Sequence, residues 1–284
     1  DYAIGRNRYI GYLISLATRS YKNMRVGLDC SNGSTSSIAK SVFDALGAKT
    51  YVIGNEPNGL NINKGCGSTH IENLQKFVLE NKLDVGFAFD GDADRCIAVD
   101  ETGMEVHGDY ILYVCGKYLK ENGRLEGNTV VATIMSNLGL FKALEKSGID
   151  YLKTTVGDKY VNEAMVEHGY VLGGEQSGHI IFSKHATTGD GMLTAIMLME
   201  VILEKKQSLH TLCENMKMYP QYLQNVRVID KKAIIENEAV QRKKHEIEKM
   251  LGENGRIILR ESGTEPVIRV MDEATTDELC RQLV

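Results

Sequence analysis

The sequence predicts an α/β fold in which two successive three-layer α/β domains, with mixed or parallel sheets, precede a smaller α+β domain. Strand-like and helix-like segments alternate twice between residues 25 and 206, which is typical of sheets covered by helices. After Pro220 this alternation ends, and a long polar helix precedes short apolar strands. The 284 residues are also enough for more than one core. We therefore expect domains at 1–100, 101–217 and 218–284.

The first α/β domain is predicted from the segments that follow residue 25. Three apolar runs of strand length alternate with two segments of helical pattern. In chain order they are RVGLD, STSSIAKSVFDALG, KTYVIG, HIENLQKFVLENK and LDVGFAF. The first helix is expected to end at Gly47, because glycine favours the conformation that closes helices.

The second α/β domain repeats this alternation from residue 108. Its segments read helix, strand, helix, strand and helix, in the order GDYILYVCGKYLKEN, TVVATI, LGLFKALEKSG, YLKTTV and DKYVNEAMVEHG. The next segment, GMLTAIMLMEVILEKK, contains Glu200 and is too short to cross a bilayer, so it predicts a buried helix. The C-terminal domain is predicted from the helix IIENEAVQRKKHEIEKML, the strands GRIILR and VIRVM, and a last helix in TTDELCRQLV.

The composition is that of a globular protein without a strong charge bias. The formal net charge is -5, and 25% of the residues are charged. Neither value indicates a protein that binds nucleic acid or membranes through bulk charge. The cysteines are scattered and form no CxxC pair, which favours reduced core thiols of a cytoplasmic protein over disulfides or a zinc site. They are Cys30, Cys66, Cys96, Cys115, Cys213 and Cys280.

The motif FDGDADR, residues 89–95, places three aspartates at alternate positions directly after an apolar run. Neighbouring carboxylates repel one another, so a loop that keeps Asp90, Asp92 and Asp94 ionised requires a cation. Their hard oxygen donors suit Mg²⁺ or Ca²⁺. The structural alternative is a solvated turn that uses aspartate and glycine only for their turn chemistry.

Two other functions compete for the same motif. As an EF-hand loop in a non-catalytic calcium-binding module, it would use Glu101 at position twelve, but Arg95 stands where glycine is required and the flanks look like strands. In an aspartyl-phosphate phosphatase or mutase, an apolar strand leads into DxD and Asp90 is the nucleophile. Asp94 then occupies the place of a threonine or valine.

Two glycine-containing loops supply further candidate binding residues. In GGEQSGHII, residues 173–181, Glu175 and Ser177 stand at alternate positions of an extended loop and could bind sugar hydroxyls. In RESGTEPVIRV, residues 260–270, a polar turn and its flanking arginines could bind phosphate. The predicted phosphate ligands are Arg260, Ser262, Gly263, Thr264 and Arg269. A capped turn and a solvent-facing hairpin are the structural alternatives.

Taken together, these motifs resemble those of the α-D-phosphohexomutases over essentially the whole chain. The segments that carry the resemblance are NEPNGLNINKGCGSTH, FDGDADR, MSNLGL, VGDKYV, GGEQSGHI, TTGDG and RESGTEPVIRVM. The resemblance implies a whole enzyme of four domains, of which this chain corresponds to the second, third and fourth. It also implies that the enzyme interconverts glucosamine 6-phosphate and glucosamine 1-phosphate for cell-wall precursor synthesis.

The same resemblance implies the roles of the site residues. Mg²⁺ would be held by Asp90, Asp92, Asp94 and a phosphoserine of the first domain, with Arg95 offsetting charge on the transferred group. The family's serine motif is absent and the chain starts at Asp1, so we expect a fragment that is inactive on its own. Its expected partners are a hexosamine phosphate and the missing domain, with a homodimer as a candidate state of the whole enzyme. Nucleic acid and membrane partners are not expected.

Four positions depart from the family pattern. Ala93 and His107 replace glycine and aspartate, and Lys159 stands where arginine is usual. Lysine supplies a charge there but no bidentate fork. Glu261 replaces proline and puts a negative charge beside the predicted phosphate site.

Overall fold

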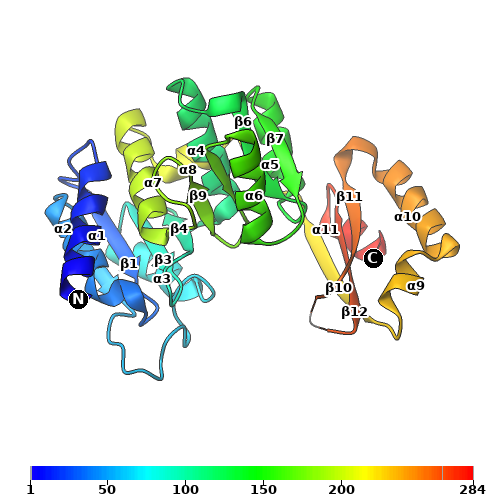
Figure 1. Cartoon of the computed structure of the whole chain (residues 1–284), viewed down its shortest axis with the longest axis horizontal. Helices are drawn as coiled ribbons and strands as arrows, with labels where there is room; N and C mark the ends of the chain where they lie inside the picture. The colour runs from blue at the N-terminus through cyan, green and yellow to red at the C-terminus, as the bar shows by residue number, and fades with distance from the viewer. Residues whose placement is uncertain (1, 264, 284) are drawn as a thin grey trace. The chain divides into compact units, whose positions relative to one another are not determined.

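The computed structural model describes residues 2–263 and 265–283, which form two compact units (Figure 1). The first unit comprises Asp1–Ser136 and Ala143–Met216, and the second comprises Asn137–Lys142 and Lys217–Val284. Two α/β sheets lie in the first unit and an antiparallel sheet lies in the second, which confirms the predicted fold class.

The first sheet has five strands in the order β2-β1-β3-β4-β5. Strands β1 (Arg25–Asp29), β2 (Lys49–Ile53) and β3 (Val85–Phe89) are parallel, as the predicted crossover helices require. Strands β4 (Cys96–Asp100) and β5 (Glu105–Val106) are antiparallel to them. The pair Phe89 and Cys96 closes the β3 and β4 hairpin, so the aspartate motif is the hairpin loop.

Helices cover both faces of this sheet. Helix α3 (Glu72–Asn81) packs Leu74 and Val78 against Ala88 and Val99. On the other face, Phe43 of α2 (Ala39–Ala45) packs against Phe87, with the centroids of the two tilted rings 5.9 Å apart. The predicted helix over 34–47 is divided, because the poor helix formers of STSS adopt the short 3-10 helix η1 (Ser34–Ser37) instead.

Helix α1 (Tyr2–Leu16) was not predicted from the sequence. It contains Gly5 and Gly11, which lower helix propensity by about 1 kcal/mol each, and its apolar residues follow no clear stripe. At both glycines the space for a side chain is open. Tertiary contacts with α2 and α7 therefore favour this helix over its intrinsic propensity.

The second sheet has the order β7-β6-β8-β9. Strands β6 (Thr129–Thr133), β7 (Asp150–Thr154) and β8 (Leu172–Gly174) are parallel, and β9 (Ile180–Phe182) is antiparallel. Apart from the extra strand β5, this arrangement repeats the first sheet. The loop between β8 and β9, which carries Glu175 and Ser177, therefore occupies the same topological position as the aspartate loop between β3 and β4.

Four helices of the second sheet lie where the sequence predicts them. They are α4 (Gly108–Glu121), α5 (Leu138–Lys146), α6 (Asp158–His168) and α7 (Gly191–Lys205). The short α8 (Leu209–Cys213) and the 3-10 turn η2 (Glu126–Asn128) before β6 were not predicted. Helix α7 is largely buried, as expected. Among the helices of the described residues, none has the length and apolar character needed to span a membrane. The six cysteines are all buried and unpaired.

The second unit contains an antiparallel sheet of order β10-β12-β11. Strand β12 (Val267–Glu273) pairs with β10 (Gln221–Arg227) and β11 (Arg256–Glu261). Strand β10 was not predicted, because every one of its residues is exposed and it has no apolar face. The helices are α9 (Lys231–Ile235), α10 (Glu238–Leu251), the 3-10 turn η3 (Gly252–Asn254) and α11 (Asp277–Leu283). Asn237 caps α10 and divides the predicted long helix in two.

Candidate active site

The three aspartates of the hairpin loop form one cluster. One carboxylate oxygen from each of Asp90, Asp92 and Asp94 lies within 4.8 Å of the other two. Asp90 is buried at the end of β3, whereas Asp92 is exposed and Asp94 is half-buried. Burial, together with the neighbouring carboxylates of Asp94 and Asp92, raises the pKa of Asp90 to about 7. The raised pKa shows that ionising all three carboxylates is unfavourable without a positive charge nearby. Three hard oxygen donors this close together fit a divalent cation such as Mg²⁺.

The backbone of the loop is held in a strained turn. Ala93 has φ of 66°, in the left-handed region that favours glycine, which accounts for the glycine usual at this position. Gly33 lies so close that a Cβ atom there would be 2.4 Å from the Gly91 carbonyl oxygen. The Ser34 amide donates to that same oxygen at 2.9 Å. The turn before α2 therefore supports the aspartate loop from one side.

Arg95 partly offsets the charge of the cluster. Its Nε lies 3.9 Å from Asp90 Oδ2 and 3.8 Å from Asp94 Oδ1, which is too far for hydrogen bonds. Its backbone N–H donates to Asp90 Oδ1 at 3.1 Å. Because 43% of the side chain is exposed, the guanidinium remains accessible to a ligand.

The loop between β8 and β9 is in direct contact with the aspartate loop. The Cys96 N–H donates to the Gly178 carbonyl at 3.0 Å. Gly178 has φ of 93°, and a Cβ atom there would lie 2.4 Å from the Cys96 carbonyl oxygen, so this approach requires glycine. Glu175 Oε1 accepts from the Gly157 N–H at 3.0 Å, and Ser177 is exposed. The structure thus places Glu175 and Ser177 on the loop that is joined to the aspartate loop.

His179 connects the two loops through side chains, a contact the sequence reasoning missed. Its ring is buried, with Nδ1 3.1 Å from Asp94 Oδ2. Nε2 accepts from the Gly189 N–H at 3.1 Å, so the proton of the neutral ring belongs on Nδ1, which donates to Asp94. The only sequence signal was its position directly after the Ser-Gly pair of the second loop.

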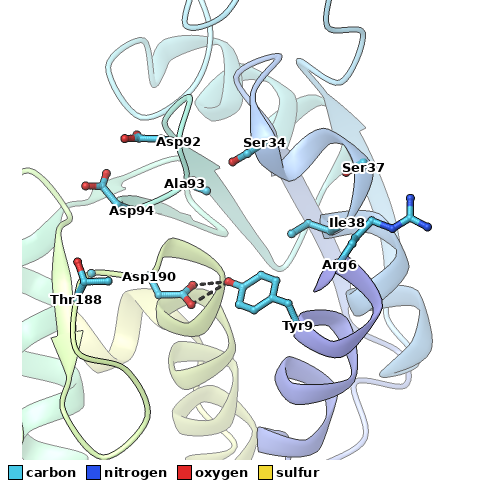
Figure 2. A pocket seen from close by; sticks show the side chains of 11 residues that line it. Arg6, Tyr9, Ser34, Ser37, Ile38, Asp92, Ala93, Asp94, Thr188 and Asp190 are labelled. Atoms are coloured by element: carbon cyan, nitrogen blue, oxygen red, sulfur yellow. Dashed lines mark hydrogen bonds between the residues drawn. The ribbon is translucent and has the colours of Figure 1, made fainter. Parts of the chain in front are cut away.

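A cavity of about 660 Å³ opens beside the aspartate loop (Figure 2). Residues of α1, the turn before α2, the aspartate loop and the loop before α7 line it. They are Arg6, Tyr9, Ser34, Ser37, Ile38, Asp92, Ala93, Asp94, Thr188, Gly189 and Asp190. Within the first unit, these segments form a recess that borders two of the three aspartates.

The predicted phosphate loop lies in the second unit. Arg260 and Arg269 are directly opposite each other on β11 and β12. Burial, together with the charge of Arg269, lowers the pKa of Arg260. The Nε atoms of both arginines are buried without a hydrogen-bond partner among the described residues. Two like charges held in a cross-strand pair favour binding of an anion.

The turn that follows Arg260 is internally braced. Ser262 is buried, and its Oγ accepts from the Glu265 N–H at 3.2 Å. The Ser262 carbonyl accepts from Lys231 Nζ at 2.7 Å, a contact that the sequence did not suggest. Gly263 is exposed, and Thr264 lies outside the described residues. Since side chains alternate along a strand, Glu261 points to the face of the sheet opposite Arg260, away from the arginine pair.

The remaining departures from the family pattern have local roles. Lys159 is exposed and lies 3.7 Å from Glu163 on the same helix. His107 caps α4, because its Nδ1 accepts from the Asp109 N–H at 3.3 Å. Burial lowers the pKa of His107 to about 4 and keeps it neutral. The flanks of the aspartate loop are strands rather than helices, so the EF-hand interpretation is wrong.

Comparison with protein-family models accounts for nearly the whole chain. Residues 7–103, 107–219 and 223–284 match the phosphoglucomutase/phosphomannomutase models for α/β/α domain II, α/β/α domain III and the C-terminal domain. The chain belongs to the phosphoglucomutase/phosphomannomutase family. Along the chain, domain II comes first, domain III second and the C-terminal domain last.

Curated members of the phosphoglucomutase/phosphomannomutase family are similar along the whole sequence. The phosphoglucosamine mutase of Lachnoclostridium phytofermentans is 62% identical over 282 residues, which cover 99% of this chain. That of Bacillus subtilis (strain 168) is 52% identical over 284 residues. In both cases the chain spans 63% of the relative's length.

Solved structures of more distant members share the fold. A phosphoglucomutase/phosphomannomutase family protein of Burkholderia thailandensis has a TM-score of 0.81 and 21% identity, covering 98% of this chain and 62% of its own. The N-acetylphosphoglucosamine mutase of Aspergillus fumigatus, solved with GlcNAc-6P and magnesium, has a TM-score of 0.74 and 18% identity. That alignment covers 96% of this chain and 66% of the other.

Proposed function

We propose that the chain forms domains II to IV of a phosphoglucosamine mutase, which interconverts glucosamine 6-phosphate and glucosamine 1-phosphate through a phosphoserine and a bisphosphate intermediate. The observation that carries this proposal is the junction of the aspartate loop and the Glu175 loop through Gly178 and His179. A cation site and a sugar site on one rigid junction suit a reaction that moves a phosphoryl group onto a sugar. Similarity to curated phosphoglucosamine mutases supports the choice of substrate.

The proposed metal ligands are Asp90, Asp92 and Asp94, with Mg²⁺ as the ion. A divalent cation bound there would lower the charge on the phosphoryl oxygens during transfer. Two hydrogen bonds within the chain orient two of these carboxylates: the Arg95 N–H donates to one oxygen of Asp90, and His179 binds Asp94. We assign Arg95 to stabilise the transferred group, because its guanidinium is accessible and near both carboxylates.

Glu175 and Ser177 are proposed to bind the sugar hydroxyls. A carboxylate accepts hydrogen bonds from two neighbouring hydroxyls, and an exposed serine both donates and accepts. In the second unit, Arg260 and Arg269 are proposed to bind the phosphate that is not transferred, together with the turn of Ser262, Gly263 and Thr264. The unpartnered Nε atoms of the two arginines support this role. The nucleophilic serine is expected outside residues 1–284.

A fusion protein tests the proposal. The first domain of the Lachnoclostridium phytofermentans relative is joined to the N-terminus of this chain, and the turnover of glucosamine 6-phosphate is followed by ³¹P NMR. We expect turnover by the fusion protein, none by residues 1–284 alone, and lower rates with glucose and mannose phosphates. No turnover despite a phosphorylated serine would contradict the assignment. The matched control is the fusion protein with Lys243→Gln, an exposed residue of α10 outside the proposed site.

The aspartyl-phosphate mechanism is the second candidate. It is motivated by the DxD pair at the end of β3, and it requires Asp90 to attack phosphorus. Asp90 is buried, and one of its oxygens already accepts from the Arg95 N–H, which favours a ligand role over a nucleophile. Mass spectrometry of the chain after incubation with acetyl phosphate distinguishes the two: a phosphorylated Asp90 would favour the phosphatase and count against the mutase.

A further inference from the structure

Tyr9 and Asp190 form a hydrogen-bonded pair in the wall of the cavity beside the aspartate loop (Figure 2). The Tyr9 hydroxyl lies 2.8 Å from both carboxylate oxygens of Asp190, although the residues are 181 positions apart in the sequence. Burial and the Asp190 charge raise the pKa of Tyr9, so its hydroxyl stays protonated and donates. A hydrogen bond to a carboxylate is among the stronger ones in proteins, and this one is half-buried.

Asp190 is the residue at which the loop before α7 is anchored. Its Oδ1 accepts from the Leu193 N–H at 2.9 Å and caps the helix. Its carbonyl accepts from the Thr194 hydroxyl at 2.8 Å. Because α7 is buried almost throughout, its N-terminal end is held in place by the surrounding core. The hydrogen bond from Tyr9 to Asp190 connects α1 to this end.

The loop before α7 and the first residue of α7 contact the aspartate loop on both sides of Asp94. The Gly191 N–H donates to the Ala93 carbonyl at 2.8 Å, and the Gly189 N–H donates to His179, which itself binds Asp94. A Cβ atom at Gly189 would lie 2.7 Å from the Asp94 carbonyl oxygen. One at Gly191 would lie 2.4 Å from the Arg95 carbonyl oxygen. The two backbones are therefore in contact, and a shift of one moves the other.

We propose that Tyr9 is a positioning residue for the aspartate loop: its hydroxyl holds Asp190, and the loop anchored there holds Ala93 and His179 in the arrangement that brings the three aspartates together. In its consequence for cation binding, this inference rests on the proposed metal site. Tyr9 does not belong to the aspartate loop or the Glu175 loop, and it acts through Asp190. It thereby gives α1 a role in the site that neither the sequence motifs nor the cation ligands suggest.

Tyr12 offers a matched control on the same helix. Its hydroxyl donates to the His185 carbonyl at 2.6 Å, so it also ties α1 to the segment before α7, but not at Asp190. Tyr9→Phe and Tyr12→Phe each remove one hydroxyl and one hydrogen bond. A general loosening of α1 would affect both variants alike, whereas positioning through Asp190 affects Tyr9→Phe alone.

The experiment compares the full chain with the two variants by amide hydrogen exchange in NMR and by Mn²⁺ titration in electron paramagnetic resonance. In Tyr9→Phe we expect the Gly189 and Gly191 amides to exchange faster. We also expect Mn²⁺ to bind about threefold to tenfold more weakly, because part of the free energy of the lost hydrogen bond to the Asp190 carboxylate is lost from cation binding. Tyr12→Phe should match the unmodified chain in both. Equal thermal stability of the two variants excludes a folding defect as the cause of any faster exchange or weaker Mn²⁺ binding in Tyr9→Phe.

Two results would overturn the inference, and a third would overturn its cation part alone. Unchanged exchange at Gly189 and Gly191 would show that the hydroxyl does not hold the loop. Faster exchange with unchanged Mn²⁺ affinity would reduce Tyr9 to a support of the α7 cap. Failure of the unmodified chain to bind Mn²⁺ would contradict the proposed metal site and remove the cation part of the inference with it, while the exchange rates alone would decide whether Tyr9 holds the loop.

Discussion

Replacing Gly178 by alanine would push a methyl group into the backbone of β4, where the Glu175 loop meets the aspartate loop. The added Cβ would lie 2.4 Å from the Cys96 carbonyl oxygen and 2.9 Å from the Ile97 side chain. Overpacking of this kind costs about 1–3 kcal/mol. The φ of 93° adds about 1–2 kcal/mol for a residue with a side chain. Loss of the Cys96 to Gly178 hydrogen bond adds about 1 kcal/mol.

The expected loss in the free energy of unfolding for Gly178→Ala is therefore about 3–6 kcal/mol. Gly169→Ala is the matched control, because Gly169 has φ of 71° but no atom within 4 Å of the added Cβ. It isolates the backbone strain and should cost about 1–2 kcal/mol. Urea unfolding followed by circular dichroism measures both. Equal losses for the two variants would refute the reasoning that the two loops are in obligatory contact.

Three further predictions concern charged groups in both units. Arg269→Gln should weaken binding of inorganic phosphate about tenfold in a ³¹P NMR titration, because it removes one of the two proposed phosphate ligands. Stability should not fall, because the substitution also removes a like-charge cross-strand pair. Arg242→Gln, at an exposed position, should leave phosphate binding unchanged. Asp272 is buried among Glu273, Cys280 and the covering helices, and burial raises its pKa from 3.8 to about 6. Its contribution to stability is therefore complete below pH 3.8 and is lost as the pH rises from 3.8 to 6. Asp272→Asn should therefore raise the free energy of unfolding at pH 7 relative to pH 4 by about 1–3 kcal/mol, and an unchanged pH profile would contradict this. Glu200→Ala should cost about 2–4 kcal/mol, because the carboxylate accepts from both the N–H and the hydroxyl of Thr18, and Glu200→Gln, which keeps an acceptor, should cost less in the same urea assay.

Local patterns were sufficient to predict most elements of the two α/β sheets. Residues such as Val85 to Phe89 form a continuous apolar run because β3 is buried on both faces, and this signal is independent of the rest of the chain. The aspartate motif was recognisable for a related reason, since all three carboxylates come from one hairpin loop. Features encoded within a few neighbouring residues could thus be predicted.

Features that depend on distant segments could not be predicted. Helix α1 carries two glycines and gains its stability from packing against α2 and α7, and β10 has no buried face of its own. His179 and Tyr9 bind Asp94 and Asp190, which are 85 and 181 positions away. No sequence spacing reveals such pairs, because they arise only when the two sheets of the first unit pack together.

Crystallography with Mn²⁺ tests the central claim most directly, which is that Asp90, Asp92 and Asp94 bind a divalent cation next to the Glu175 loop. Crystals of residues 1–284 are grown with Mn²⁺, and an anomalous difference map is calculated at the manganese edge. We predict a peak within coordination distance of all three carboxylates. A map with strong peaks elsewhere and none at the three aspartates would contradict the account.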